Sequence, residues 1–171
     1  MRFRRILPRS AGISRRSMMS RIRRRIETLQ VLVDGSSLAL TYVAECSLVS
    51  TEFQSVSDVH STPQVHRRWL LQVLHSTRAI DTYLYAFVRC FGYMPPQTPP
   101  AHLRAYLQAL RGSPTSGRGS LNSQQYARFK ADIVYPRNRY MHEAGAYPMN
   151  DQEVLSLLAA MYDLVSTVDG L

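Results

Sequence analysis

The feature that most constrains the fold is a long run of apolar residues at helical spacing after Thr62 and Pro63. A hydroxyl side chain before a proline is a strong start signal for a helix, because the hydroxyl caps free N–H groups and proline suits the first turn. The apolar side chains that follow recur at steps that place them on one side of a helix. They are Val65, Trp69, Val73, Ile80, Leu84, Phe87 and Val88. We therefore expect one long amphipathic helix that ends before Gly92 and Pro95.

Apolar residues at helical spacing also fill the chain on both sides of this stretch. Residues 22–33 and 37–56 predict two helical segments, interrupted by Gly35 and the serines after it. The second segment is either a separate helix or a kinked continuation of the first. Beyond the long helix, Thr98 and Pro99 repeat the start signal and predict a short helix through the leucines that follow. We find no convincing strand pattern.

Three further signals organise the C-terminal third of the chain. Residues 113–120 have the composition of an exposed loop. A helix is predicted over residues 123–134, and Pro136 is expected to stop or kink it and to begin a short new helix that Gly145 closes. Asn150, with a glutamate three residues later, predicts a capping box at the start of the last helix. The expected fold is all-α, an antiparallel bundle of five or six helices.

The basic residues are distributed unevenly along the chain. The 171 residues are 45% apolar, enough for one core, and carry a net charge of +9. Residues 1–25 contain ten arginines and no acid, whereas residues 26–171 contain eleven basic and twelve acidic groups. We therefore expect a basic, disordered tail over residues 1–18 and a single, nearly neutral helical domain over residues 19–171.

The Arg-rich tail has three interpretations. It is an arm that neutralises RNA phosphates without sequence preference, an organelle-type transit peptide, or a start of the chain with no function of its own. A secretory signal is not expected, because no apolar run of the needed length follows the arginines.

Composition also limits the compartment and the cofactors. No stretch approaches the roughly 20 apolar residues of a membrane span, so a soluble, cytoplasmic protein is expected. Cys46 and Cys90 lie far apart among apolar residues, which favours buried thiols over a zinc site. We expect no metal and no cofactor.

The residues with the clearest chemistry are Arg137, Asn138 and His142. An arginine supplies a permanent positive charge and a fork that grips phosphate, and an imidazole moves a proton near neutral pH. These groups suffice for a metal-free ribonuclease, in which the 2′-hydroxyl of RNA attacks the adjacent phosphate. Arg137 and His142 are the expected catalytic groups and Asn138 supports them.

Spacing alone is weak evidence in a chain with this much arginine. Arg68 and His75 also fall within the range of an Arg-x(4-6)-His pattern, and we interpret that pair as structural or as positioning RNA. What distinguishes the later pair is Asn138 directly after the arginine, because the chain contains only three asparagines.

Residues 137–142 resemble the R-N-x-x-x-H form of the signature of HEPN domains, all-helical bundles rich in RNA-cutting toxins and antiviral effectors. The resemblance implies a metal-independent RNA endonuclease, a homodimer in which the motifs of two chains meet in one cleft, and an antitoxin or other protein that regulates it. The chain departs from one subfamily, whose modified tyrosine stands two residues after the histidine. Ala144 occupies that place and the nearest tyrosine is Tyr147, so that subfamily's regulation is not implied.

Helical geometry separates the two main groups of the motif. Asn138 and His142 are four residues apart and share a face, whereas Arg137 and His142 lie about 140° apart around the axis. One phosphate can then contact Arg137 and His142 only if the first turn is irregular, as Pro136 makes plausible, or if a second chain contributes.

The other residues of the motif have two interpretations each. Arg139 and Tyr140 are candidates for RNA contacts. Arg139 is also spaced for a surface ion pair with Glu143, and Tyr140 and Met141 for packing.

Three functions remain open from the sequence. The first is a metal-independent endoribonuclease that acts as a homodimer in toxin–antitoxin or antiviral defence. The second is a non-catalytic HEPN-type module that binds RNA or a nucleotide. The third is a helical adaptor with a nucleic-acid-binding basic tail.

Overall fold

The computed structural model describes Ser20, Arg24, residues 64–95 and residues 98–171. All regular structure in this part of the chain is helical and it contains no strand, which confirms the all-α class. No helix among the described residues is long and apolar enough to cross a membrane.

Several expectations fall outside the described residues. They concern the basic tail with its boundary at residue 18, the helices predicted over residues 22–33 and 37–56, and Cys46. The expected total of five or six helices includes these segments.

The long helix predicted after Pro63 is α3, Val65–Cys90. Gln64 precedes it in an extended conformation and offers no side-chain cap, so the helix begins two residues later than the Thr-Pro signal predicts. Its end is as expected, because Gly92 has a φ of 73°, a conformation that favours glycine. The apolar stripe is buried apart from Val65, which is 42% exposed at the first turn.

The short helix α4, Leu103–Ala109, begins later than predicted. Thr98 and Pro99 do not start it. Pro100 follows Pro99, and a residue before proline is pushed away from helical angles, so no helix begins there, and His102, just before α4, is extended. The Nδ1 atom of His102 caps the helix instead, by accepting a hydrogen bond from the Ala105 N–H at 3.1 Å.

Residues 123–142 form one uninterrupted helical rod, which we call the motif rod. It consists of α5 (Ser123–Phe129), a π-helical turn η2 (Lys130–Val134) and α6 (Tyr135–His142). The start at Ser123 is as predicted, with a complete capping box formed by Asn122 and Gln125.

Pro136 does not stop the preceding helix, contrary to one expectation, but it does lie in the first turn of the predicted short helix that carries the motif, α6, which continues directly from the π turn. The helix absorbs it through the π turn, in which the Tyr135 N–H bonds to the Lys130 carbonyl, five residues back. A π turn widens the helix where proline would otherwise clash with a carbonyl of the preceding turn. Gly145 does not close α6 either. The helix ends at His142, and Gly145 lies in the turn beyond, with a φ of 77°.

The last helix, α7, covers Asp151–Asp169 and begins with the predicted cap, in which the Asn150 side chain accepts from the Glu153 N–H. The glutamate does not complete a capping box. Its carboxylate accepts from the Met149 N–H at 3.0 Å, one residue before the cap.

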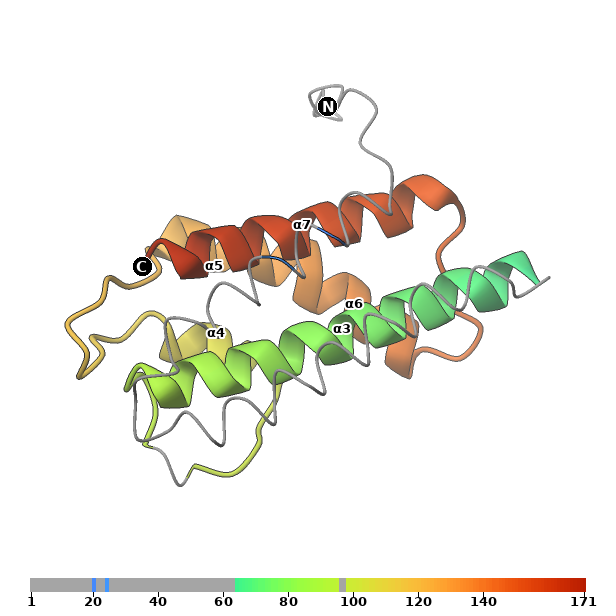
Figure 1. The fold of residues 1–171 in the computed structure, drawn as a ribbon. Coiled ribbons are helices and arrows are strands. Elements are labelled where there is room, and N and C mark those ends of the chain that lie inside the picture. The colour runs from blue at the N-terminus through green and yellow to red at the C-terminus, as the bar shows by residue number, and fades with distance from the viewer. Residues whose placement is uncertain (1–19, 21–23, 25–63, 96–97) are drawn as a thin grey trace.

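The long elements alternate in direction along the chain (Figure 1). Trp69 near the start of α3 donates to Asp151 at the start of α7, and Tyr83 further along α3 donates to Asp169 at the end of α7, at 2.9 Å. The two helices are therefore parallel to each other. The motif rod runs the opposite way and packs against both, which leaves α6 near the starts of α3 and α7.

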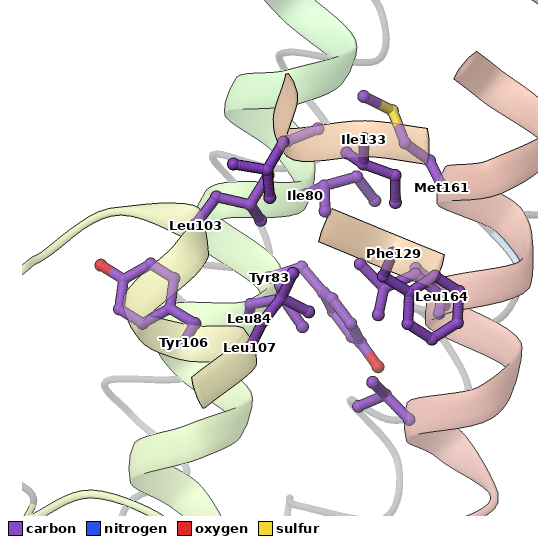
Figure 2. Packing of buried hydrophobic residues seen from close by; sticks show 14 of the residues in the cluster. Ile80, Tyr83, Leu84, Leu103, Tyr106, Leu107, Phe129, Ile133, Met161 and Leu164 are labelled. Carbon is purple, nitrogen blue, oxygen red and sulfur yellow. The ribbon is translucent and has the colours of Figure 1, made fainter. Parts of the chain in front are cut away.

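One apolar cluster joins these elements. Figure 2 shows side chains from α3, α4, the motif rod and α7 meeting in it. Those buried to less than 2% exposure include Ile80, Tyr83, Leu84, Phe87, Tyr106, Leu107, Phe129, Ile133, Met161 and Leu164. The motif rod is anchored here by Phe129 and Ile133, just before the residues of the motif.

The predicted loop over residues 113–120 is tied to the end of the chain. The Arg118 guanidinium donates to the Asp169 carbonyl at 2.9 Å and lies over the ring of Phe91. The Gly119 N–H donates to the Leu171 carbonyl at 2.6 Å. These contacts hold the loop against the C-terminal end of α7, which is the end far from α6.

Candidate nucleic-acid site on helix α6

The structure brings Arg137, Asn138 and His142 together on α6. One terminal nitrogen of Arg137, Nη1, lies 2.9 Å from Asn138 Oδ1 and 3.2 Å from His142 Nε2. Asn138 and His142 are exposed, whereas Arg137 is half-buried. A guanidinium and an imidazole therefore meet at the surface within a single chain.

Asn138 explains how Arg137 reaches across the helix. Residues 135–142 are α-helical, so Arg137 and His142 do lie about 140° apart around the axis. The expected irregularity precedes α6, in the π turn, rather than within it. The side chain of Arg137 is long enough to reach around the helix to His142. The Asn138 amide oxygen accepts a hydrogen bond from the guanidinium and holds it on the face that Asn138 shares with His142. Neither an irregular first turn nor a second chain is needed for this contact.

The contact with Arg137 defines the tautomer of His142. A guanidinium has only N–H groups to donate, so in a hydrogen bond His142 Nε2 is the acceptor and the ring proton sits on Nδ1. The basic lone pair of the imidazole thus faces the group that would hold a phosphate. A phosphate that drew the guanidinium away would free the same lone pair to accept a proton.

Asp81 is a neighbour of this site that the sequence did not reveal. It lies on α3, is partly buried, and its Oδ1 finds no hydrogen-bond partner among the described residues. Burial raises the pKa of the Asp81 carboxyl above its ordinary value of 3.8, while the charges of Arg137 and His102 act in the lowering direction. The Asp81 carboxyl therefore lies within electrostatic reach of Arg137, although it is on another helix. Only the fold brings residues 81 and 137 together.

His102 is the second imidazole near this cluster. Its Nδ1 accepts the cap hydrogen bond of α4, which leaves Nε2 to carry the ring proton. The two hydrogen bonds therefore assign opposite tautomers to His102 and His142. No sequence motif connects His102 with Arg137, because the position of His102 depends on how α4 packs against α3.

Arg139 and Tyr140 have different environments. Arg139 is exposed and its Nε lies 4.0 Å from Glu143 Oε2, as the spacing predicts for a surface pair. Tyr140 is 9% exposed and its hydroxyl donates to Glu153 Oε2 at 2.9 Å. Tyr140 is thus a packing residue in this structure, and of these two only Arg139 is placed to contact RNA.

Glu153 fixes α6 relative to α7. Its carboxylate accepts from the Tyr140 hydroxyl and from the Met149 N–H. Burial, the hydrogen bond and the negative charge of Glu153 together raise the pKa of Tyr140 to about 12. The loop between α6 and α7 is also held to α3, because Tyr147 stacks on His66 with ring centroids 4.4 Å apart. The helix that carries the motif, α6, is therefore held in place by contacts with both α7 and α3.

The earlier pair, Arg68 and His75, lies on α3, and both side chains are partly buried. The Nε atom of Arg68 is buried without a hydrogen-bond partner among the described residues. This environment favours the structural interpretation of the pair.

Within the described part of the chain, no group of three or more His, Cys, Asp or Glu side chains could hold a metal ion. Cys90 is partly buried and packs against the core.

Comparisons of the chain with known protein families, with curated proteins and with solved structures each found no match.

Proposed function

We propose that this chain is a metal-independent RNA endonuclease of the HEPN type, which cleaves by attack of the 2′-hydroxyl on the adjacent phosphate. The observation that carries the proposal is the contact of Arg137 Nη1 with His142 Nε2 at 3.2 Å on an exposed helix face. It joins a phosphate-binding group and a proton-transfer group in one place.

The reaction uses the two groups in sequence. A phosphate is a stronger acceptor than a neutral imidazole, so it takes the guanidinium of Arg137 and frees His142 Nε2. His142 then removes the proton of the 2′-hydroxyl, and the oxygen forms a bond to phosphorus. Arg137 stabilises the negative charge that builds on the phosphate oxygens. The bond from phosphorus to the 5′-oxygen breaks, which leaves a 2′,3′-cyclic phosphate and a 5′-hydroxyl.

The leaving 5′-oxygen also needs a proton, and a second imidazole supplies it best. Each copy of the motif holds one, so we propose a homodimer that pairs the motif-bearing faces across a twofold axis. Each chain would contribute one His142 to a shared site, one acting as base and one as acid. We place this activity in the cytoplasm, in toxin–antitoxin or antiviral defence, with an antitoxin or regulatory protein restraining it.

The test is cleavage of single-stranded RNA by the purified full chain in the presence of a chelator. Wild type should release products that end in a 2′,3′-cyclic phosphate. His142→Ala should lower the rate by about a hundredfold or more, because general acid–base catalysis contributes about 10²–10⁴-fold. Arg137→Lys, which keeps the charge and loses the fork, should retain only part of the activity.

His75→Ala is the matched control, because it removes the histidine of the other Arg–His pair. It should cut RNA at the wild-type rate if its helical circular dichroism is unchanged. Equal activity in His142→Ala and wild type would remove the proposal. RNA binding without cleavage in wild type would leave the non-catalytic binding module instead.

A further inference from the structure

The exposed side of the motif rod continues beyond the motif itself. Tyr135, Asn138, Arg139 and His142 follow each other at steps of three, one and three, which places them on one helical face, and all four are exposed. Tyr135 is 55% exposed, which is high for a large aromatic side chain. This face therefore has an aromatic ring about two turns before His142.

The π turn adds a cation to this ring. In an α-helix Lys130 and Tyr135, five residues apart, would point in directions about 140° apart. The π turn bonds the Tyr135 N–H to the Lys130 carbonyl, so the two residues lie one above the other. Lys130 Nζ accordingly lies 5.3 Å from the centroid of the Tyr135 ring. π-helical turns are rare in proteins, and those that occur are often found at functional sites.

We infer that Tyr135 is the stacking platform for a base of single-stranded RNA next to the cleaved phosphate, with Lys130 contacting the backbone beside it. The choice of ligand rests on the proposed function. An exposed ring beside cations is what single strands bind, since every unpaired base has a face that stacks on an aromatic side chain. From Tyr135 to His142 the helix rises about 10 Å, so a base on the ring and a phosphate at Arg137 can belong to one strand.

The charges on this face fit a single strand. Lys130, Arg137 and Arg139 are the cations, and the ion pair of Arg139 with Glu143 is exposed and long at 4.0 Å. Exposed pairs of this kind contribute little, so a phosphate can replace Glu143 at small cost. A base inside a duplex cannot reach the Tyr135 ring, because its faces are covered by neighbouring base pairs.

The experiment measures binding apart from cleavage. The probe is a fluorescent single-stranded oligoribonucleotide with 2′-O-methyl groups, which cannot undergo 2′-hydroxyl attack, and the readout is anisotropy with the full chain. Tyr135→Ala should weaken binding about tenfold, because stacking contributes about 1–3 kcal/mol per base. Tyr135→Phe should bind as wild type does. Lys130→Gln should lower the slope of log Kd against log salt by about 0.7, the value for one phosphate contact on a single strand.

Met149→Ala is the matched control, because Met149 is an exposed large side chain at 64% on the loop before α7. It should bind as wild type does. The inference is overturned if Tyr135→Ala binds the single strand as tightly as wild type. It is also overturned if the substitution weakens a duplex of the same sequence by the same factor.

Failure of this inference and failure of the proposed function give different results. If cleavage depends on His142 but RNA binding is unchanged by Tyr135→Ala, only the role of Tyr135 as a stacking platform is ruled out. If RNA binding depends on Tyr135 but wild type does not cleave RNA, only the proposed nuclease activity is ruled out.

Discussion

The α3–α7 interface and the outer face of α6 lie in the same small fold and differ in what their residues do. Along the interface, apolar side chains such as Phe87 and Leu164 are fully buried, and polar groups such as Tyr83 and Asp169 are paired at its ends. On α6, the exposed side chains Asn138 and His142 contact Arg137 and contribute nothing to the core.

This difference separates stability from chemistry. Buried apolar surface is the main favourable term in folding, whereas substitutions at exposed positions usually change stability by less than about 0.5 kcal/mol. We therefore expect the interface to control whether the protein folds and the face of α6 to control what it does. Tyr140 and Asp81 lie between the two regions. Substituting either should change both the stability of the fold and the activity of the α6 face, each to a limited extent.

The largest change in stability should come from the core. Phe87→Ala should lower the free energy of unfolding by about 4 kcal/mol, because it removes a fully buried ring and leaves a cavity. Tyr135→Ala removes a ring of similar size that is 55% exposed and should cost less than about 0.5 kcal/mol. Urea denaturation of both variants measures the contrast. Similar losses in the two variants would break the comparison between the regions.

A smaller effect is expected where α6 is fastened to α7. Tyr140→Phe should cost about 1 kcal/mol at neutral pH, because it removes a hydrogen bond to the Glu153 carboxylate. The fold raises the pKa of Tyr140 from 10.0 to about 12, so the native state holds the proton more tightly than the unfolded chain does. The stabilisation is present below pH 10 and is lost as the pH rises toward 12.

The measurement for Tyr140 is the difference in unfolding free energy between wild type and Tyr140→Phe at several pH values. The difference should shrink between pH 10 and pH 12. A constant difference over this range would show that the hydroxyl is not held by Glu153. RNA cleavage at neutral pH should persist in Tyr140→Phe, because the substitution leaves Arg137 and His142 in place.

The smallest effect, and one of opposite sign, is expected at Asp81. Burial raises the pKa of this carboxyl, so the native state favours its protonated form, and stability is lost as the pH rises from 3.8 through the raised value. Asp81→Asn keeps the shape without the charge and should stabilise the protein at neutral pH by about 1 kcal/mol or less. The gain should vanish in acid. A loss of stability at neutral pH would mean that the attraction between Asp81 and Arg137 outweighs the cost of burial.

The helices were predictable where local rules and burial agree. The apolar stripe of α3, the cap at Asn150 and the start of the motif rod at Ser123 all follow from spacing and capping chemistry, and the structure confirms them. The start at Thr98 and Pro99 was wrong, because a second proline holds the preceding residue extended. The expectation that Pro136 stops the preceding helix was wrong, because a π turn carries the helix on, whereas its place in the first turn of the short helix α6 is as predicted.

The candidate site was predictable only in part. The spacing of Asn138 and His142 identified the shared face, but the reach of Arg137 across the helix depends on a side-chain conformation that spacing does not determine. Asp81 could not be found from the sequence, because its proximity to Arg137 results from the packing of α3 against α6. Tyr135 could have been found by extending the motif's helical face one turn toward the N-terminus.

The most direct test of the central claim is cleavage of an oligonucleotide that carries a single ribose among deoxyriboses, incubated with the full chain and a chelator. If Arg137 and His142 promote attack by the 2′-hydroxyl, wild type cuts once, on the 3′ side of that ribose, and leaves a 2′,3′-cyclic phosphate. His142→Ala cuts about a hundredfold or more slowly, although its unfolding free energy matches that of wild type. Cutting at deoxyribose positions, or equal cutting by His142→Ala, would contradict the account.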